Sequence, residues 1–236
     1  MQLFYTEDID ERGGFLPEAE ARHCLRALRL RTGDRMQITD GNGRLYTAVL
    51  LDSSDRNCPF SVEKIEDMPP AFPFYLHLAV APTKNADRME WFVEKAVEIG
   101  ISEITCLQCE HSERSGLKAE RMQRLMVAAM KQSLHFRLPV FNEHRSFKDF
   151  MQLQQHAGGQ KFIAYCGEDG DIRPLKHACL PGGEVVILIG PEGDFSPEEV
   201  RLAKQCGFLP VSMGRSRLRT ETAALVACHT VHLINE

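Results

Sequence analysis

Short apolar strands separated by tight turns occupy the first 70 residues of the chain. The spacing of apolar positions predicts one helix and three strands, over residues 18–28, 35–39, 45–50 and 60–65. Between the first two strands, Asp-Gly-Asn-Gly at 40–43 favours the left-handed backbone of a tight hairpin. One helix among short strands predicts a small β-barrel-like domain, which we place at residues 1–70.

Three prolines, Pro69, Pro70 and Pro73, separate this region from the rest, because proline lacks the N–H that a continuing helix or strand needs. Beyond them, apolar strands and helices alternate. The predicted strands cover 75–80, 104–107, 162–165, 184–190 and 209–211, and the predicted helices cover 87–99, 118–134, a stretch from 196 onward and 220–234. This alternation is typical of an α/β fold with a parallel sheet covered on both faces. We expect the second domain to span residues 71–236.

Composition places the chain among compact globular proteins. Of its 236 residues, 43% are hydrophobic and 26% are charged, which is enough apolar material for a core and too little charge for a disordered tail. The longest apolar runs fall short of the ~20 residues that a membrane-spanning helix needs. The N-terminus also lacks the basic start of a signal peptide. We therefore expect a cytoplasmic protein with no membrane partner.

The overall charge argues against a nonspecific binder of polyanions, since 28 basic against 33 acidic side chains leave a formal net charge of −5. Arginines nevertheless cluster locally, and such clusters can follow phosphates even on an acidic protein. The clusters include Arg22, Arg26 and Arg29, a group from Arg114 to Arg137, and Arg215, Arg217 and Arg219. For any one cluster, a solvated helix face is the alternative interpretation.

Eight cysteines would suit a disulfide framework in a secreted protein, but in a chain of this length without a secretory signal we expect reduced thiols. Cys106 and Cys109 form an isolated Cys-x-x-Cys. A structural zinc site needs about four ligands, and no second pair at comparable spacing follows. The motif lies in a strand-like run rather than at a helix start, where a redox thiolate would be activated. We expect neither a metal nor a redox role.

The segment from Leu188 to Glu199 is the most informative in the chain. A buried strand breaks at Gly190–Pro191, and a new helix opens with Ser196 as N-cap, Pro197 at its first position and Glu199 completing a capping box. The loop between them lies at the carboxyl end of a strand, where open α/β proteins bind ligands. It matches neither the phosphate-binding loop nor the Gly-x-Gly-x-x-Gly pattern. Taken alone, Gly-Pro-Glu-Gly is more often an ordinary turn.

A second segment, from Met213 to Ala224, has the same organisation. An apolar strand gives way to Gly214, then to three arginines within five residues, and then to a helix with Thr220 as its predicted N-cap and Glu221 in its first turn. Arginines so close to an apolar strand favour an anionic partner. A solvated basic connector is the alternative.

Together, Gly-Pro-Glu-Gly after an apolar strand and Leu-Arg-Thr-Glu-Thr-Ala about 25 residues later resemble the SPOUT superfamily of knotted methyltransferases, and within it the ribosomal RNA small-subunit methyltransferase E family. Lys-Asn-Ala-Asp-Arg-Met-Glu, beginning at Lys84, is similar to that family's Lys-Gly-x-Arg-Met-Glu helix, and Ser112–Ser115 matches its Ser-Glu-Arg-Ser segment. The N-terminal barrel fits the family's PUA-like RNA-binding domain. The resemblance therefore covers essentially the whole chain.

The chain departs from the family pattern at three places. Asp194 stands where a second glycine is common, and Arg215–Arg217 replaces a more usual proline-containing stretch. The segment at 131–135 keeps Gln132 but lacks a Gly-Arg pair. The first two changes fall in the expected cofactor and substrate loops, and the third affects an expected RNA contact.

The resemblance implies a C-terminal trefoil knot, a homodimer and S-adenosylmethionine as methyl donor. It implies as substrate N3 of a uridine in small-subunit (16S) ribosomal RNA, with the assembled subunit favoured as partner. The base must be unpaired or extruded, because pairing hides N3. The cofactor would lie against twelve residues of the two segments: Leu188, Ile189, Gly190, Pro191, Glu192, Gly193, Met213, Gly214, Leu218, Thr220, Thr222 and Ala223.

Within this framework, Arg219 is the hypothesised stabiliser of the uracil imide, and Glu221 the hypothesised proton acceptor or its orienter. A structural role is the alternative for each. The hypothesised RNA contacts are Arg22, Arg26, Arg29, Lys84 and Arg114. Two other functions stay open: a related knotted methyltransferase acting on another RNA or on ribose, and a non-catalytic RNA-binding assembly factor.

Overall fold

The computed structural model describes residues 2–53, 57–114, 116–165 and 172–236. The chain packs as two compact units. One consists of Met1–Ala71 with Val127–Leu138, and the other of Phe72–Met126 with Pro139–Glu236. Residues 127–138 therefore pack with the N-terminal unit, although they follow the proline-rich linker in sequence.

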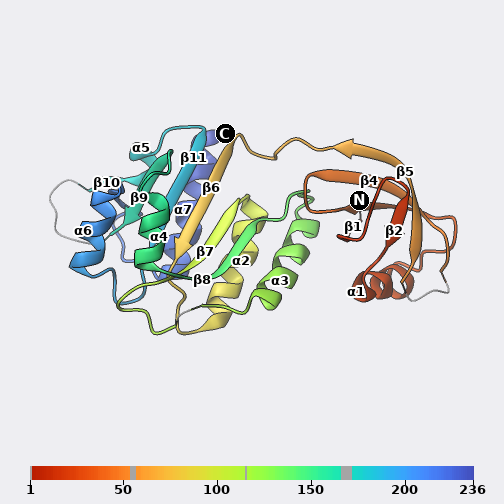
Figure 1. Ribbon diagram of the computed structural model, residues 1–236, viewed down its shortest axis with the longest axis horizontal. Helices are drawn as coiled ribbons and strands as arrows, with labels where there is room; N and C mark the ends of the chain where they lie inside the picture. Colours follow the sequence, from red (N-terminus) through yellow and green to blue (C-terminus); the bar gives the residue numbers. More distant parts are fainter. Residues whose placement is uncertain (1, 54–56, 115, 166–171) are drawn as a thin grey trace. The chain divides into compact units, whose positions relative to one another are not determined.

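Five strands form the sheet of the N-terminal unit, in the order β1-β3-β4-β5-β2 (Figure 1). They are β1 (Leu3–Tyr5), β2 (Gly13–Phe15), β3 (Arg35–Thr39), β4 (Arg44–Leu50) and β5 (Pro59–Asp67). β1 runs parallel to β3, and the other neighbours are antiparallel. The three predicted strands are confirmed. β1 and β2 were not predicted, since three residues are too few to show an alternating pattern.

The predicted N-terminal helix is also confirmed, with a change of geometry along its length. α1 (Glu18–Arg22) continues into a π-helical turn, η1 (His23–Ala27). Arg29 then leaves the helix with a φ of 57°. Apolar side chains of the helix and the sheet share one core, which includes Phe4, Leu16, Cys24, Ile38, Leu50 and Phe60. Burial of this shared core is what fixes so short a helix on so small a sheet.

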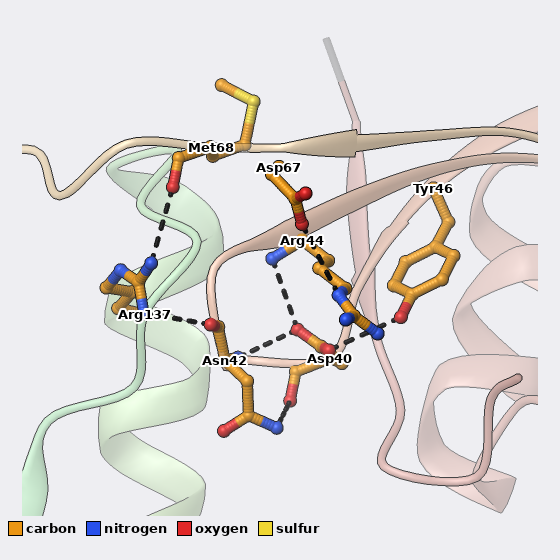
Figure 2. Close-up of polar contacts among 7 residues, drawn as sticks. All are labelled: Asp40, Asn42, Arg44, Tyr46, Asp67, Met68 and Arg137. Atoms are coloured by element: carbon orange, nitrogen blue, oxygen red, sulfur yellow. Dashed lines mark hydrogen bonds and ion pairs between the residues drawn. The ribbon is translucent and has the colours of Figure 1, made fainter.

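The β3–β4 hairpin is held by polar contacts from two sides (Figure 2). Asp40 Oδ1 accepts the Asn42 N–H at 2.8 Å, which shapes the turn from within. Arg137 donates from Nη1 to the Asn42 carbonyl at 2.9 Å and from Nη2 to the Met68 carbonyl at 3.4 Å. The Gly43 N–H also donates to the Phe136 carbonyl, at 2.8 Å. These bonds explain why residues 127–138 belong to this unit.

Seven parallel strands form the sheet of the second unit, in the order β10-β12-β9-β11-β6-β7-β8 (Figure 1). They are β6 (Phe74–Val80), β7 (Glu103–Gln108), β8 (Val140–Ser146), β9 (Gln160–Ala164), β10 (Arg173–Pro174), β11 (Gly183–Ile189) and β12 (Leu209–Ser212). The helices that follow the strands are α2 (Ala86–Ile99), α3 (Ala119–Gln132), α4 (Phe147–Gln154), α5 (Leu175–Ala178), α6 (Pro197–Gln205) and α7 (Thr220–Asn235). The predicted α/β class with a parallel sheet is confirmed.

Helices cover both faces of this sheet. On one face, α4 and α6 enclose a core that includes Ala79, Ile163, Leu188, Phe150, Val200 and Phe208. Because side chains alternate along a strand, Leu78, Ile187 and Ile189 point to the opposite face, where α7 packs on β6, β11 and α2. The chain must therefore pass from β12, beside β9, to α7, over β6 and β11. The loop that makes this passage lies at the carboxyl edge of the sheet.

Candidate functional site

Two loops at the carboxyl edge of the parallel sheet form the walls of a cavity of about 870 Å³. One loop, residues 190–196, joins β11 to α6, and the other, residues 213–219, joins β12 to α7. Thr220 Oγ1 donates a hydrogen bond of 3.0 Å to the Gly190 carbonyl and so ties the two loops together. The two glycine-containing segments singled out by the sequence therefore meet at one site.

Local sequence builds the first loop. Ser196 Oγ accepts the Glu199 N–H at 3.3 Å, Glu199 Oε2 accepts the Ser196 N–H at 2.9 Å, and Pro197 occupies the first turn. The predicted capping box is thus confirmed. A Cβ at Gly190 would lie 3.1 Å from the Phe195 ring, so the smallest residue is needed where the loop folds back on itself.

In the second loop, Gly214 has a φ of 129°, a conformation that L side chains rarely adopt. The predicted N-cap of α7, Thr220, is wrong. Arg219 holds the N-cap position without a side-chain cap bond, and Thr220 is the first helical residue. Its hydroxyl donates instead to the carbonyl of the half-buried Gly190, a partner that lies far away in the sequence.

Nine of the twelve predicted cofactor-binding residues line the cavity. They are Ile189, Gly190, Pro191, Glu192, Met213, Gly214, Leu218, Thr220 and Ala223. The cavity lining does not include Leu188, whose side chain belongs to the core beneath α4 and α6. It also omits Gly193, which lies against His111, and Thr222, which is half-buried on α7.

Other lining residues were missed by the sequence. β9 and β12 contribute Ala164, Val211 and Ser212, and Tyr165, Ile172 and Asp194 also line the cavity. β9 lies between β11 and β12, so its carboxyl end necessarily reaches the same place. The order of the strands is the missing information, because no local pattern shows it.

The two hypothesised catalytic residues lie in different surroundings. Arg219 is exposed and lines the cavity. The Glu221 side chain is only 8% exposed, and its Oε1 lies 3.9 Å from Nε of Arg88 on α2. Its Oε2 is buried and has no hydrogen-bond partner among the described residues. Glu221 thus faces α2 rather than the cavity, so its arrangement suits orientation of the start of α7 better than direct contact with a ligand.

Lys84 and Arg114 lie together at the same edge of the sheet. Arg114 Nη2 donates to the Lys84 carbonyl at 3.2 Å, and Lys84 Nζ lies 3.0 Å from Glu113 Oε2. The hydrogen bond to Glu113 raises the pKa of the Lys84 ammonium. The Lys84 N–H also donates to Glu192 Oε1, at 3.2 Å, which joins these residues to the cavity loop. The last residue of the Ser-Glu-Arg-Ser segment, Ser115, lies outside the described residues.

The three N-terminal arginines belong to the other unit. Arg22, Arg26 and Arg29 are all exposed. Arg22 pairs with Glu18, one turn earlier on α1, at 2.6 Å. The structure therefore brings Lys84 and Arg114 together within the second unit.

The surroundings of the cysteines and acidic residues bear on thiol reactivity and metal binding. Burial raises the pKa of the Cys106 thiol to about 12, and it also raises the pKa of Cys109. Both thiols are therefore protonated at neutral pH and weakly nucleophilic. In the described part of the chain, no group of three or more His, Cys, Asp or Glu could hold a metal ion. Within those same ranges, no helix combines the length and apolar character needed to cross a bilayer.

Comparison with known proteins gives two family matches. Residues 70–232 match the RNA methyltransferase domain, and residues 16–62 match the RNA methyltransferase PUA domain. A ribosomal RNA small subunit methyltransferase E from Mesomycoplasma hyopneumoniae is 30% identical over 233 residues, which cover 95% of this chain and 96% of that protein.

Solved structures agree with these matches. The crystal structure of a probable rRNA-methyltransferase from Porphyromonas gingivalis is 43% identical, with a TM-score of 0.91 over 100% of this chain and 98% of that one. A ribosomal RNA small subunit methyltransferase E from Neisseria gonorrhoeae, bound to S-adenosyl methionine, is 26% identical, with a TM-score of 0.79 over 99% and 98% of the two chains.

Proposed function

We propose that this chain, which belongs to the RNA methyltransferase family, transfers the methyl group of S-adenosylmethionine to N3 of a uridine in small-subunit ribosomal RNA. The observation that carries the proposal is the cavity between the two loops that the Thr220–Gly190 hydrogen bond joins. The names of the relatives support ribosomal RNA as substrate, and the Neisseria structure supports the methyl donor. N3 of a uridine follows from the family resemblance of the motifs.

The cavity residues suit S-adenosylmethionine. The volume of the cavity, about 870 Å³, lies within the ~300–1,000 Å³ range of small-molecule sites. Apolar side chains of Ile189, Leu218 and Ala223 would contact the flat adenine, while backbone groups of the two glycine-containing loops offer hydrogen bonds. The bound cofactor supplies an electrophilic methyl group on a sulfonium. The tasks left to the protein are alignment of the acceptor and stabilisation of its deprotonated imide.

Arg219 is placed to stabilise that imide, because it lines the cavity at the N-terminus of α7 and is open to solvent, from which RNA must approach. Glu221 would act behind it, as a positioning residue that fixes the start of α7 against Arg88. Arg219→Ala should lower kcat by about 100-fold, with a change in cofactor Kd of less than about threefold. Arg201→Ala, at an exposed arginine on α6, is the matched control. Unchanged turnover in Arg219→Ala would remove Arg219 from the mechanism.

RNA would contact Lys84 and Arg114 beside the cavity and Arg22, Arg26 and Arg29 on the N-terminal unit. Phosphate contacts of this kind make the affinity fall as the salt concentration rises. The slope of log affinity against log salt concentration is about one per neutralised phosphate. Arg26→Glu should therefore reduce that slope, whereas Lys148→Glu, at an exposed lysine on α4, should not. Equal slopes for the wild type and Arg26→Glu would exclude the contact on the N-terminal unit.

Mass spectrometry of ribosomal RNA from cells with and without the gene tests the function as a whole. Loss of one N3-methyluridine from small-subunit RNA is the expected result. A lost mark on transfer RNA or on ribose would identify another RNA methyltransferase activity. An unchanged methylation pattern, together with no binding of S-adenosylmethionine in calorimetry, would indicate an assembly factor. We also propose that the enzyme acts in the cytoplasm as a homodimer, on the assembled subunit, which light scattering and methylation assays on subunits and naked RNA test.

A further inference from the structure

Asp194 combines a cavity position with an unusual backbone conformation. Its φ of 63° lies in the left-handed region, which disfavours most side chains other than glycine. Its N–H donates to the Pro191 carbonyl at 3.0 Å, and its carbonyl accepts a hydrogen bond of 3.0 Å from His111 Nδ1. Glycine would adopt this conformation more easily. The aspartate side chain therefore calls for an explanation of its own.

The Asp194 carboxylate is held at the cavity wall. Its Oδ1 accepts the Phe195 N–H at 2.8 Å, and Phe195 is buried. An ionised carboxylate offers about four acceptor positions, so this bond leaves most of its capacity for a ligand. Because this bond already restricts the side chain, contact with a ligand in the cavity would cost little further side-chain entropy.

Five charged residues line the cavity: Glu192, Asp194, Arg215, Arg217 and Arg219. Glu192 and the three arginines are exposed, whereas Asp194 is half-buried. Water and salt screen exposed charges more strongly than half-buried ones. Among the described cavity residues, Asp194 thus carries the least screened charge. The arginines alone would disfavour a positively charged ligand, and Asp194 counters them from inside the wall.

We propose that Asp194 is a specificity-determining residue that favours the sulfonium form of the cofactor over the spent form. This inference rests on the proposed function. In the transfer, the bond between sulfur and the methyl carbon breaks, and its electron pair stays on sulfur. The methyl carbon bonds to N3 of the imide, whose proton has already passed to water or a base. The product, S-adenosylhomocysteine, keeps the adenosine and amino-acid groups but has a neutral sulfur, so a fixed carboxylate in the cavity wall favours the sulfonium-bearing substrate over the product.

Calorimetry with the full chain tests this proposal, using S-adenosylmethionine and S-adenosylhomocysteine as the two ligands. Asp194→Asn keeps the size of the side chain, the acceptor for the Phe195 N–H and tolerance of the left-handed backbone, and removes only the charge. It should raise the Kd of S-adenosylmethionine about fivefold and that of S-adenosylhomocysteine less than about twofold. Asp194→Gly, which relieves the backbone, should lose the same discrimination. Glu198→Gln removes a charge from a side chain 76% exposed on α6 and should change neither Kd.

Equal changes for the two ligands, or no change for either, would overturn the proposal, because Asp194 would then act on the amino-acid group or on the fold alone. Retention of the wild-type ratio in Asp194→Gly would overturn it as well. Failure of the wild-type protein to bind either ligand is a separate result, which would overturn the proposed function itself. Product inhibition gives a second measurement: in Asp194→Asn the ratio of the product Ki to the cofactor KM should fall about fivefold.

Discussion

Thr220 Oγ1 donates a hydrogen bond of 3.0 Å to the carbonyl oxygen of Gly190, which lies thirty residues earlier in the chain. The bond joins the first residue of α7 to the residue that follows β11, and Thr220 is only 6% exposed. Both residues line the cavity. Because the hydroxyl of the buried Thr220 needs a partner, this bond holds together the two loops that form the cavity walls.

Thr220→Val should remove the hydrogen bond that joins the two loops. Valine keeps the branched shape but leaves the Gly190 carbonyl without its donor, which costs about 1–3 kcal/mol of stability. Because the two walls are no longer tied, the Kd of S-adenosylmethionine should rise by about fivefold or more. Calorimetry and urea unfolding measure the two effects. Thr220→Ser, which keeps the hydroxyl, is the control and should bind within about twofold of wild type; similar binding by the two variants would show that the bond does not shape the site.

Glu199 supports two segments at once. Its Oε2 accepts the N–H of Ser196, and its Oε1 accepts the N–H of Glu110, which follows β7, at 2.9 Å in each case. Ser196→Ala removes one cap bond and should cost about 1 kcal/mol. Glu199→Ala leaves the buried Ser196 N–H and the part-buried Glu110 N–H unpaired and should cost about 2–4 kcal/mol. Urea unfolding compares them, with Glu198→Gln expected within about 0.5 kcal/mol of wild type. A smaller loss in Glu199→Ala than in Ser196→Ala would contradict the double role.

Structural features that depend only on residues close together in the sequence are the ones predicted best. Ser196, Pro197 and Glu199 lie within four residues, and their capping box forms as predicted. Thr220 fits the same cap preference, yet its hydroxyl bonds to Gly190, because a partner thirty residues away competes with the local one. A cap residue is therefore predictable only where no tertiary acceptor comes within reach.

Strand order limits the prediction of the site. Both glycine-containing loops were predicted, but the insertion of β9 between β11 and β12 was not, so Ala164 and Tyr165 were missed. β8 was missed for another reason: most of its seven residues are polar or exposed, so the alternating pattern is absent. In the sequence, Arg137 belongs to one of the basic clusters that could follow phosphates. Only the fold shows that its guanidinium is occupied by the carbonyls of Asn42 and Met68.

A comparison of alanine substitutions at Gly43 and Gly33 separates the stability cost of backbone strain from that of a steric clash. Their φ angles are 97° and 93°. A Cβ at Gly43 would lie 2.4 Å from Cζ of Arg137, whereas a Cβ at Gly33 would have nothing within 4 Å. Gly33→Ala should cost about 1 kcal/mol through strain alone. Gly43→Ala should cost about 1 kcal/mol more, because Arg137 must leave its two carbonyl partners.

A double-mutant cycle in thermal or urea unfolding measures that difference. In an Arg137→Ala background, Gly43→Ala should cost no more than Gly33→Ala, since the clash has been removed. If Gly43→Ala cost more than Gly33→Ala by the same amount with and without Arg137, the substitution would disturb the hairpin itself rather than its bonds to Arg137.

His77 should make stability depend on pH. It lies on β6, 7% exposed, with Nε2 at 2.8 Å from Thr105 Oγ1 and the ring edge-on to Phe150. Burial lowers the pKa of the imidazole, and the nearby Glu103 carboxylate opposes this only in part. Above the unfolded pKa of about 6.5, both folded and unfolded chains hold a neutral ring. As the pH falls below that value, the unfolded chain takes up the proton first, so stability declines toward the lower folded pKa.

The loss should approach about 1.4 kcal/mol per pH unit in that window. His77→Gln has no titrating ring, so its free energy of unfolding should fall less steeply than that of wild type between pH 6.5 and 5, whatever its stability at pH 7. Urea unfolding across this range measures the slopes, and His156→Gln, at an exposed site, controls for the loss of an imidazole. A buried neutral histidine takes up a proton when the chain unfolds in acid, so it must make the wild-type slope steeper. Parallel slopes for wild type and His77→Gln would therefore assign the acid sensitivity to other groups.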